Sequence, residues 1–533
     1  MKITVAEKIA EKGMDLFREL GWQVVTPEEF KADPAAAVAD ADALIVRSAV
    51  QADEALLAQA TRLKIVGRAG VGVDNIDVES ATRRGIVVMN APGASSTAVA
   101  ELAMGLMLSL ARKIPVADSS TRAGKWEKKS LQGTELRGKT LGIVGLGRIG
   151  LELARRATAF GMEVIATDPY ASPNLARENH VQLLSADELY AKADYISLHL
   201  GLTPQTTGMI NAATIAKMKR GVKLVNCARG ELIDETAVSV ALASGQMGGA
   251  AVDVYATEPP KSSPLFASPN VVATPHLGAS TKEAQEAVGI QIASQVREYL
   301  QHGVVQNAVN VLSLTDTEYE QLQPYIKAAQ RTGSLLAQIF DGNLEEIHVE
   351  YEGAVREWKT DLLRSAAIAG VLQQDTVETV NLVNAGATAQ ERGVRVSELK
   401  APNSADVPFN ALRITLRGGT QEVTARCTVV HRNEPRIVEL NGIEIEARLE
   451  GDILINLNRD LPGVVGNIGI VLGNNGVNIA RLSLGRESEV PASGEPRKAL
   501  ALIQIDGPAS KAVLDAVQAI PAVIRTRSVS LPK

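Results

Sequence analysis

Short apolar runs alternate with amphipathic stretches over residues 2–92 of the chain. Amphipathic, helix-like stretches lie at 13–20 and 54–60. The apolar, β-type runs are 3–7, 22–25, 43–48, 63–70 and 85–90. Strands that alternate with helices are typical of a parallel sheet with helices on its faces. The pattern therefore predicts an α/β unit, and it contains no glycine fingerprint for a dinucleotide.

A second α/β pattern begins at Thr140, after an apolar helical stretch over 99–113 and a polar segment over 119–139. Residues 140–147 predict a strand that runs into a glycine turn, and residues 148–160 predict a helix. Further strands are expected at 162–168, 195–200, 223–227, 249–254 and 271–274. This pattern indicates a complete doubly wound nucleotide-binding unit of the Rossmann type.

A long helix is predicted over 282–301, and we expect it to pack on the first unit. The second unit would then be inserted into the first, with chain crossings near 92–96 and 280–283 that form a hinge over a cleft. The expected domains are 1–94 with 282–311, a flavodoxin-like substrate-binding domain, and 95–281, the Rossmann domain.

The pattern of apolar and polar residues changes after Val311. A polar, acidic segment at 315–325 predicts a linker. Helices are expected at 328–339 and 359–371, with a strand at 345–352 and β-type runs over 411–447. These elements predict an α+β domain at 317–450 without a catalytic constellation. Residues 452–533 predict a βαββαβ order, which is a ferredoxin-like fold.

Size and charge narrow the class of protein. A chain of 533 residues is too long to fold around a single hydrophobic core, so several domains are expected. Its formal charge of −6 provides no basic field for nucleic acid, which is therefore not an expected partner. The start lacks the apolar core of a signal peptide, and no run suits a membrane span. The two cysteines, Cys227 and Cys427, are far apart in sequence and cannot form a disulfide framework, which suits a reducing compartment, so we expect a cytoplasmic protein. No metal site is expected.

The glycine fingerprint Gly145, Gly147 and Gly150 lies between a predicted strand and a predicted helix. Asp168 ends the next strand. Such glycines let the backbone approach a pyrophosphate at the helix N-terminus. Asp168 would accept hydrogen bonds from ribose hydroxyls and repel a 2′-phosphate, which predicts NAD as the cofactor. The alternative is that Asp168 only forms a turn before Pro169.

Arg229, Asp253, Glu258 and His276 all fall beyond predicted strand ends, where doubly wound sheets bind ligands. An imidazole oriented by a carboxylate can take a hydroxyl proton, and a guanidinium can bind a substrate carboxylate. We expect Asp253 on the nicotinamide side. Taken alone, His276 would more often be structural and Arg229 a surface residue, but the set predicts a 2-hydroxy-acid dehydrogenase. Cys227 is expected to line the pocket.

The segments GLGRIG, NCARGELID, DVYATEPP and TPHLGAS resemble the D-isomer-specific 2-hydroxy-acid dehydrogenase family over residues 1 to about 310. The resemblance implies that His276 is the acid/base, Glu258 its partner and Arg229 the substrate anchor. It also implies cofactor contacts at Val71, Arg148, Ile149, Asp168, Leu200, Cys227, Asp253, His276, Leu277, Gly278 and Ala279.

The stretch 67–77, GRAGVGVDNID, resembles the branch of that family that acts on phosphoglycerate. The resemblance implies that the backbone at Gly70, Val71 and Gly72 holds the substrate carboxylate. Arg47 and Arg68 lie at strand ends, where they could bind a phosphate bidentately; the alternative is ordinary surface charge. Val50-Gln51 departs from the Thr and basic residue that many relatives carry there.

The segments 458–466 and 476–480 resemble the ACT regulatory domain, which binds amino acids between subunits. Pro462-Gly463 would present backbone groups to a carboxylate, Asp460 would hold an ammonium, and Asn478 would add hydrogen bonds. Asn458 stands where relatives often carry His or Tyr. The alternative is that Pro462-Gly463 is turn chemistry only.

Residues 317–450 resemble the intervening domain of long-form members of that branch. The combination implies NAD-dependent oxidation of 3-phosphoglycerate as the first step of serine biosynthesis, in a homotetramer inhibited by L-serine. A secondary 2-oxoglutarate reductase activity is also implied. The alternatives are a glyoxylate, hydroxypyruvate or D-lactate dehydrogenase, and a non-catalytic sensor of NAD or amino acids.

Overall fold

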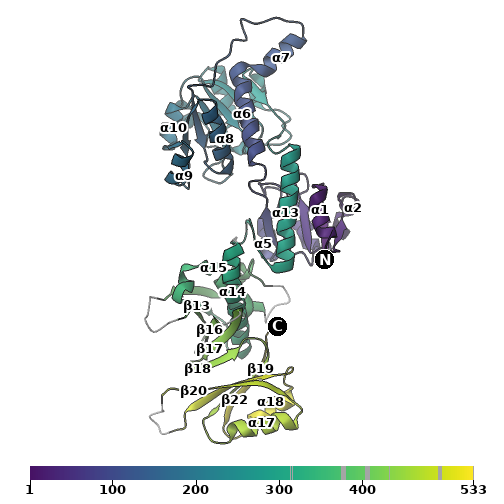
Figure 1. Ribbon diagram of the computed structural model, residues 1–533, viewed down its shortest axis with the longest axis vertical. Helices are drawn as coiled ribbons and strands as arrows, with labels where there is room; N and C mark the ends of the chain where they lie inside the picture. Colours follow the sequence, from purple (N-terminus) through teal and green to yellow (C-terminus); the bar gives the residue numbers. More distant parts are fainter. Residues whose placement is uncertain are drawn as a thin grey trace.

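The structure is a computed structural model that describes residues 1–312, 314, 316–373, 380–401, 409–430, 433–489 and 495–531. Four sheets follow one another along an elongated molecule, with the seven-stranded sheet at one end and the C-terminal sheet at the other (Figure 1). The two α/β units, the mixed unit and the ferredoxin-like unit agree with the fold predicted from the sequence.

The N-terminal sheet is parallel, with the strand order β2-β1-β3-β4-β5 of flavodoxin-like folds. Its strands are β1 (Lys2–Val5), β2 (Gln23–Val25), β3 (Ala43–Val46), β4 (Ile65–Arg68) and β5 (Val87–Asn90). One face carries α2 (Pro27–Ala32), α3 (Pro34–Val38), α4 (Glu54–Gln59) and α5 (Val78–Arg83), and each face has its own hydrophobic core.

The other face of this sheet is covered by α1 (Glu11–Arg18) and the long α13 (Lys282–His302). The two helices cross at glycines, since a Cβ on Gly13 would lie 2.8 Å from the carbonyl oxygen of Gly289. The predicted return of the chain to the first sheet is therefore present.

The second sheet is parallel, with the order β12-β11-β10-β9-β6-β7-β8. Its strands are β6 (Thr140–Val144), β7 (Glu163–Thr167), β8 (Gln182–Leu183), β9 (Tyr195–Leu198), β10 (Val222–Asn226), β11 (Met247–Val252) and β12 (Val271–Ala273). The short edge strand β8 was not predicted. Strand β6 lies between β9 on one side and β7 on the other, so the chain connections diverge above β6, where such sheets bind nucleotides.

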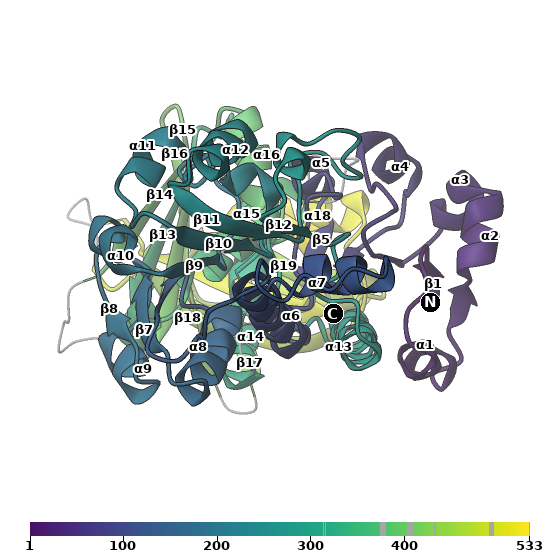
Figure 2. The same ribbon diagram turned by 90° about the horizontal axis from the view of Figure 1, so that it is seen from above.

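Helices cover both faces of this second sheet, and Figure 2 shows α8 and α9 on one side with α11 and α12 on the other. The helices are α6 (Ser96–Arg112), α7 (Ile114–Arg122), α8 (Arg148–Ala159), α9 (Pro173–Glu178), α10 (Ala186–Lys192), α11 (Ala212–Ala216) and α12 (Glu235–Ala243), with 3-10 turns η1 (Gly230–Leu232) and η2 (Pro264–Ala267).

The third unit has a mixed sheet of order β14-β13-β15-β16-β17-β18. Its strands are β13 (Glu346–Glu352), β14 (Arg395–Lys400), β15 (Ala411–Gly418), β16 (Gln421–Val430), β17 (Glu434–Leu440) and β18 (Ile443–Arg448). The helical elements are α14 (Asp316–Ile339), η3 (Gly353–Glu357), α15 (Thr360–Leu372) and α16 (Ala385–Glu391). Strand β14 and helix α16 were not predicted.

The predicted linker at 315–325 is wrong for residues 316–325, which form the first turns of α14; Thr315 lies outside the described residues. Leu322, Tyr325, Ala328 and Ala329 are buried at helical spacing, so one face of the polar segment belongs to the core. Pro324 lies inside this helix, and a proline at such a position ordinarily argues against a helix, so the sequence alone did not predict one here.

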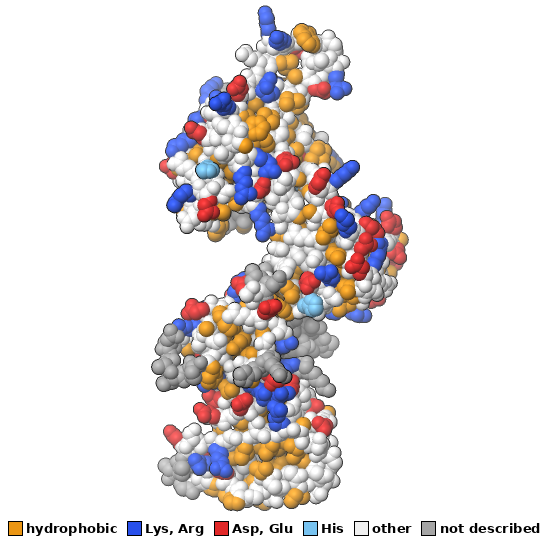
Figure 3. Space-filling view, in the orientation of Figure 1, with side chains coloured by type: hydrophobic (Ala, Val, Ile, Leu, Met, Phe, Trp, Pro, Cys, Tyr) orange, Lys and Arg blue, Asp and Glu red, His pale blue; other side chains and the backbone are white. Residues whose placement is uncertain are grey.

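The C-terminal sheet is antiparallel, in the order β20-β21-β19-β22, as the ferredoxin-like fold requires. Its elements are β19 (Gly451–Arg459), α17 (Val464–Asn474), β20 (Ile479–Arg486), β21 (Lys498–Ile505), α18 (Lys511–Gln518) and β22 (Val523–Leu531). Edge strand β20 exposes Ile479, Leu482 and Leu484. In Figure 3, hydrophobic side chains gather on this lowest unit.

Direct contacts join the third unit to its neighbours. The side-chain amide of Asn381 donates a hydrogen bond to the carbonyl of Gly85, in the turn before β5, and that of Asn384 donates to the carbonyl of Arg83, the last residue of α5. Asp341 pairs with Arg525 and Arg527 on β22. No helix in the described part of the chain has the length and apolar character that a membrane span requires.

Candidate active site

Three loops at the carboxyl ends of adjacent strands bring Arg229, Glu258 and His276 together. They follow β10, β11 and β12. The buried Asn226 shapes the first loop, because its amide donates to the carbonyl of Arg229 and accepts from the N–H of Ala228. A Cβ on Gly230 would lie 1.9 Å from the carbonyl carbon of Tyr255, so only glycine lets the first two loops approach this closely.

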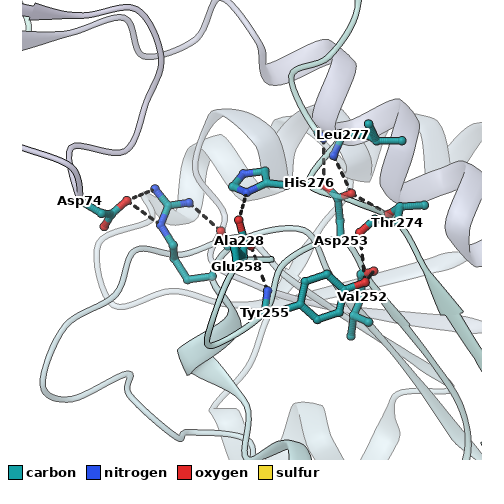
Figure 4. Close-up of polar contacts among 11 residues, drawn as sticks. Asp74, Ala228, Val252, Asp253, Tyr255, Glu258, Thr274, His276 and Leu277 are labelled. Carbon is teal, nitrogen blue, oxygen red and sulfur yellow. Dashed lines mark hydrogen bonds and ion pairs between the residues drawn. The ribbon is translucent and has the colours of Figure 1, made fainter. Parts of the chain in front are cut away.

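His276 and Glu258 form a hydrogen-bonded pair. The Nδ1 of His276 lies 2.7 Å from Oε2 of Glu258, and Oε1 of Glu258 accepts the N–H of Tyr255 at 3.0 Å (Figure 4). A carboxylate accepts only, so the neutral imidazole carries its proton on Nδ1 and keeps a lone pair on Nε2. The hydrogen bond therefore orients the ring as the predicted base would require, and the role of His276 as the base stays a prediction.

Asp253 is fully buried, and both of its carboxylate oxygens accept hydrogen bonds from the loop that contains His276. Oδ1 accepts from the hydroxyl of Thr274 at 2.6 Å and the N–H of Leu277 at 2.7 Å, while Oδ2 accepts the N–H of Gly278 at 2.8 Å. These contacts hold the loop in which His276 has a positive φ of 54°. A nicotinamide contact for Asp253 stays a prediction.

Arg229 is engaged by Asp74, a residue that the sequence reading did not single out. Nη2 and Nε of Arg229 lie 2.9 Å and 3.1 Å from Oδ2 of Asp74, and Nη1 donates to the carbonyl of Ala228 at 2.6 Å. Asp74 belongs to the loop after β4, in the other sheet. In the sequence, Asp74 is marked only by its place within residues 67–77, the stretch that resembles the phosphoglycerate branch.

The predicted carboxylate cradle lies next to this ion pair. A Cβ on Gly72 would lie 1.8 Å from Nη2 of Arg229, and a Cβ on Gly70 would lie 1.4 Å from Nη1 of Arg68. Val71 between them is exposed, and its carbonyl accepts from the amide of Asn90 at 2.6 Å. The backbone of this loop therefore lies against two guanidinium groups.

Arg47 and Arg68 lie at the ends of β3 and β4. Nε of Arg68 is buried and has no hydrogen-bond partner within the described ranges. Burial, together with Arg229 and Arg47 nearby, lowers the pKa of Arg68, and Asp74 and Glu7 oppose that shift. A guanidinium buried among other cations suits an anionic ligand.

The loop that carries Arg47 is held by two residues that the sequence reading missed. Glu7 accepts the backbone N–H groups of Arg47, Ala49 and Val50 at 2.7–3.1 Å. The amide of Asn75 donates to the carbonyls of Arg47 and Val50. The side chain of Arg47 donates to the carbonyl of Lys8. Polar residues that organise a loop from distant segments leave no local sequence signal.

The glycine loop after β6 fits a dinucleotide. Gly145 has a φ of +95°, and a Cβ there would lie 2.3 Å from the carbonyl oxygen of His199, so this turn requires glycine. Gly150 packs as closely on the carbonyl of Gly145, whereas the space around Gly147 is open to an approaching pyrophosphate. The carboxylate of Asp168 accepts the N–H groups of Leu146 and Tyr170, which places it beside this loop.

The other predicted cofactor residues surround this loop or the loop that carries His276. Arg148 donates to the carbonyl of Pro92 at the chain crossing, and the carbonyl of Ala279 accepts from Gln285. Leu200 lies beside Gly145, Ile149 is half-buried in the first turn of α8, and Leu277 is exposed. Burial, and secondarily Asp253, raises the pKa of the Cys227 thiol, which favours the neutral thiol over the thiolate. A cofactor contact for Cys227 stays a prediction.

The predicted effector residues make separate contacts in the C-terminal unit. The side chain of Asn458 is buried against Asn456, Asp460 pairs with Arg486 at 3.2 Å, and Asn478 donates to Asp506 at 2.7 Å. Gly463 has a φ of +87° and precedes α17, and Pro462 before it is exposed. An effector site made of these residues stays a prediction.

Comparison with known proteins defines the class. Residues 104–278 match the NAD-binding domain of the D-isomer specific 2-hydroxyacid dehydrogenases. The D-lactate dehydrogenase of Aquifex aeolicus, solved with NAD and lactic acid, is 27% identical with a TM-score of 0.52, covering 59% of this chain and 100% of its own. The protein is therefore an NAD-dependent 2-hydroxyacid dehydrogenase.

Comparison over the whole chain is more specific. Residues 321–441 match the intervening domain of D-3-phosphoglycerate dehydrogenase. The D-3-phosphoglycerate dehydrogenase of Methanocaldococcus jannaschii is 40% identical over 524 residues, 98% of each chain, and that of Bacillus subtilis is 38% identical over 531 residues, 100% of each chain. The chain belongs to the D-3-phosphoglycerate dehydrogenase family.

Proposed function

We propose that the protein oxidises 3-phospho-D-glycerate at C2 to 3-phosphooxypyruvate with NAD. The observation that carries the proposal is the oriented His276–Glu258 pair beside the Arg229 and Arg68 guanidinium groups. A base and two guanidinium groups on facing loops match a substrate with a hydroxyl between two anionic ends. The names of the full-length relatives support this substrate.

The proposed chemistry uses Nε2 of His276 as the base. It takes the proton of the C2 hydroxyl while the C2 hydride leaves and the C–O bond becomes a carbonyl. NAD, when bound, supplies the acceptor for that hydride. The carboxylate of Glu258 stabilises the imidazolium that forms, as the hydrogen bond to Nδ1 allows.

Arg229 and the backbone of Gly70–Gly72 would hold the substrate carboxylate, and Arg229 would polarise the developing carbonyl. Arg47 and Arg68 would bind the 3-phosphate. The buried Nε of Arg68, without a partner in the described part of the chain, supports this assignment. Gly145, Gly147, Gly150 and Asp168 would hold NAD.

We further propose that this step opens serine biosynthesis in the cytoplasm, that L-serine is a feedback ligand of the ferredoxin-like unit, and that 2-oxoglutarate is a secondary substrate. A homotetramer is also proposed. The exposed Ile479, Leu482 and Leu484 on edge strand β20 support self-association, because apolar edge strands pair readily with other strands.

The experiment is a substrate panel followed by NADH formation. It compares 3-phosphoglycerate with D-glycerate, D-lactate and glycolate, each with and without L-serine. We expect the largest kcat/KM for 3-phosphoglycerate and inhibition by L-serine. Turnover of D-lactate or glycolate without turnover of 3-phosphoglycerate would contradict the proposed substrate, and NAD binding without any turnover would indicate a sensor.

A further inference from the structure

Asp74 occupies the edge of Arg229 that would grip a carboxylate. Both Nε and Nη2 of Arg229 point to the same oxygen of Asp74, at 3.1 Å and 2.9 Å. This Nε–Nη2 edge is one of the forks with which a guanidinium binds a carboxylate by two parallel hydrogen bonds. A substrate carboxylate that uses this fork must first take it from Asp74.

The surroundings of the pair make such an exchange feasible. The side chain of Asp74 is 66% exposed and that of Arg229 is 28% exposed, so the carboxylate can return to water while the guanidinium stays in place. The bond from Nη1 to the carbonyl of Ala228 also fixes the guanidinium independently of Asp74. An exposed ion pair is weak, which suits a contact that must break in every turnover.

Asp74 also balances the positive charge of the nearby arginines. Arg229 and Arg47 lie near enough to Arg68 to lower its pKa, and the acids that oppose this shift are Asp74 and Glu7. Glu7 is occupied by three backbone N–H groups, whereas Asp74 contacts a guanidinium that the substrate is to use. Of these two acids, Asp74 is therefore the one that competes with an incoming carboxylate.

We propose that Asp74 is a positioning residue that acts as an internal competitor: its carboxylate holds the Arg229 fork until a substrate carboxylate replaces it. This role rests on the proposed function, because it takes Arg229 as the substrate anchor. It adds a selection step, since a hydroxy compound without a carboxylate cannot displace Asp74. The exchange involves no covalent step.

The same exchange links substrate binding to the two sheets. Asp74 follows β4 and Arg229 follows β10, so the ion pair joins a loop of the first sheet to a loop of the second. When the substrate carboxylate takes the fork, this bridge is replaced by one that contains the substrate. The substrate, and no longer the protein alone, then joins the loop after β4 to the loop after β10.

The test measures the affinity of oxamate, a carboxylate mimic of a 2-oxo acid, for the enzyme with NADH bound. Asp74→Asn keeps an oxygen that Arg229 can bond but removes the charge, so we expect oxamate to bind about two- to fivefold more tightly. Asp74→Glu restores a competing carboxylate and should return the affinity to that of the wild type. Glu79→Gln, which removes an acid of the same segment that pairs with Arg83, should leave the affinity unchanged.

Unchanged or weaker oxamate binding in Asp74→Asn would overturn the proposal, and so would an equal effect in Glu79→Gln. The steady-state constants give a second reading: KM for the 2-hydroxy acid should fall more than kcat changes. Because oxamate binding requires no turnover of 3-phosphoglycerate, failure of the proposed substrate is seen separately, in the wild-type panel.

Discussion

The carboxylate of Asp253 lies under the backbone of His276 and holds the two residues that follow it. The N–H groups of Leu277 and Gly278 donate to the two carboxylate oxygens at 2.7 Å and 2.8 Å. The N–H of His276 donates to the backbone carbonyl of Asp253 at 2.9 Å. His276 is thereby kept at a positive φ, which a residue with a side chain seldom adopts. Asp253 thus sets the direction of the imidazole.

Asp253→Asn should therefore lower kcat about tenfold or more with little change in KM, because an amide N–H₂ would face the N–H of Gly278 and displace the loop. The free energy of unfolding should also fall by about 1–3 kcal/mol, since a buried donor loses its partner. Steady-state kinetics and urea denaturation measure the two effects. Glu163→Gln, an exposed acid at the start of β7, is the control. A variant with wild-type kcat would show that Asp253 does not orient His276.

His276→Gln removes the base and keeps a polar side chain of similar size. We expect kcat to fall by about 10²-fold or more, with NADH affinity close to that of the wild type. Stopped-flow turnover and the fluorescence of bound NADH separate the two quantities. Glu258→Gln leaves the imidazole in place and should reduce kcat less. A near-normal rate in His276→Gln would remove it from the mechanism.

Asp168→Ala should weaken NAD binding and lower the preference for NAD over NADP by about tenfold or more, because the variant loses ribose hydrogen bonds and the repulsion of a 2′-phosphate. The ratio of kcat/KM for the two cofactors is the measurement. The structure adds that Asp168 also holds the N–H groups of Leu146 and Tyr170, so the glycine loop should loosen as well. An unchanged cofactor ratio would count against the assignment.

Glu7→Gln should raise KM for 3-phosphoglycerate about three- to tenfold and leave KM for D-glycerate nearly unchanged. One amide group would face backbone N–H groups of the 47–50 loop and move Arg47. The comparison of the two substrates isolates the phosphate contact. Glu11→Gln, an exposed acid of α1, serves as the control. Equal effects on both substrates would place the defect outside the phosphate site.

His199 should make the stability of the protein depend on pH. Burial lowers the pKa of His199 from 6.5 to about 4, while Nε2 is paired with the hydroxyl of Ser197. Between these values the unfolded chain binds the extra proton, so the free energy of unfolding falls as pH decreases from 6.5 toward 4. The full loss, reached below the folded-state pKa, is on the order of 3 kcal/mol.

Urea denaturation of the wild type and of His199→Gln across this range measures the effect. Gln can keep the bond to Ser197 but does not titrate, so the variant should show a flatter profile. His302→Gln, at the exposed end of α13, should keep the wild-type profile. Parallel profiles for all three proteins would contradict the assignment.

The sequence predicted the four sheets well because each strand of the two α/β units is a short apolar run between helical segments. It also predicted that Arg229, Glu258 and His276 share one edge, since strand order alone brings their loops together. The linker prediction failed at 316–325 because burial against a distant sheet, and not local polarity, decides the state of that segment.

The missed residues of the site have one physical property in common. Asp74, Glu7 and Asn75 act through partners in other segments: Asp74 on a guanidinium after β10, and the other two on the loop after β3. Their side chains are ordinary surface types whose partners are fixed only by tertiary structure. Conversely, Asn458, Asp460 and Asn478 share a plausible pattern, but each makes a different contact in the folded chain.

The hydrogen bond from Asn381 to the carbonyl of Gly85 shows that residues 1–311 are stabilised in part by the domain that follows them. Relatives such as the Aquifex D-lactate dehydrogenase match 59% of this chain with their entire length. In this protein a Cβ at position 85 would lie 2.6 Å from the amide nitrogen of Asn381, so the turn is fitted to the later domain. Cutting the chain after residue 311 would leave two backbone carbonyls, those of Arg83 and Gly85, without their amide donors. The third unit thus supports the end of α5 and the turn before β5, and a chain that ends at residue 311 would lose both of these contacts with the N-terminal unit.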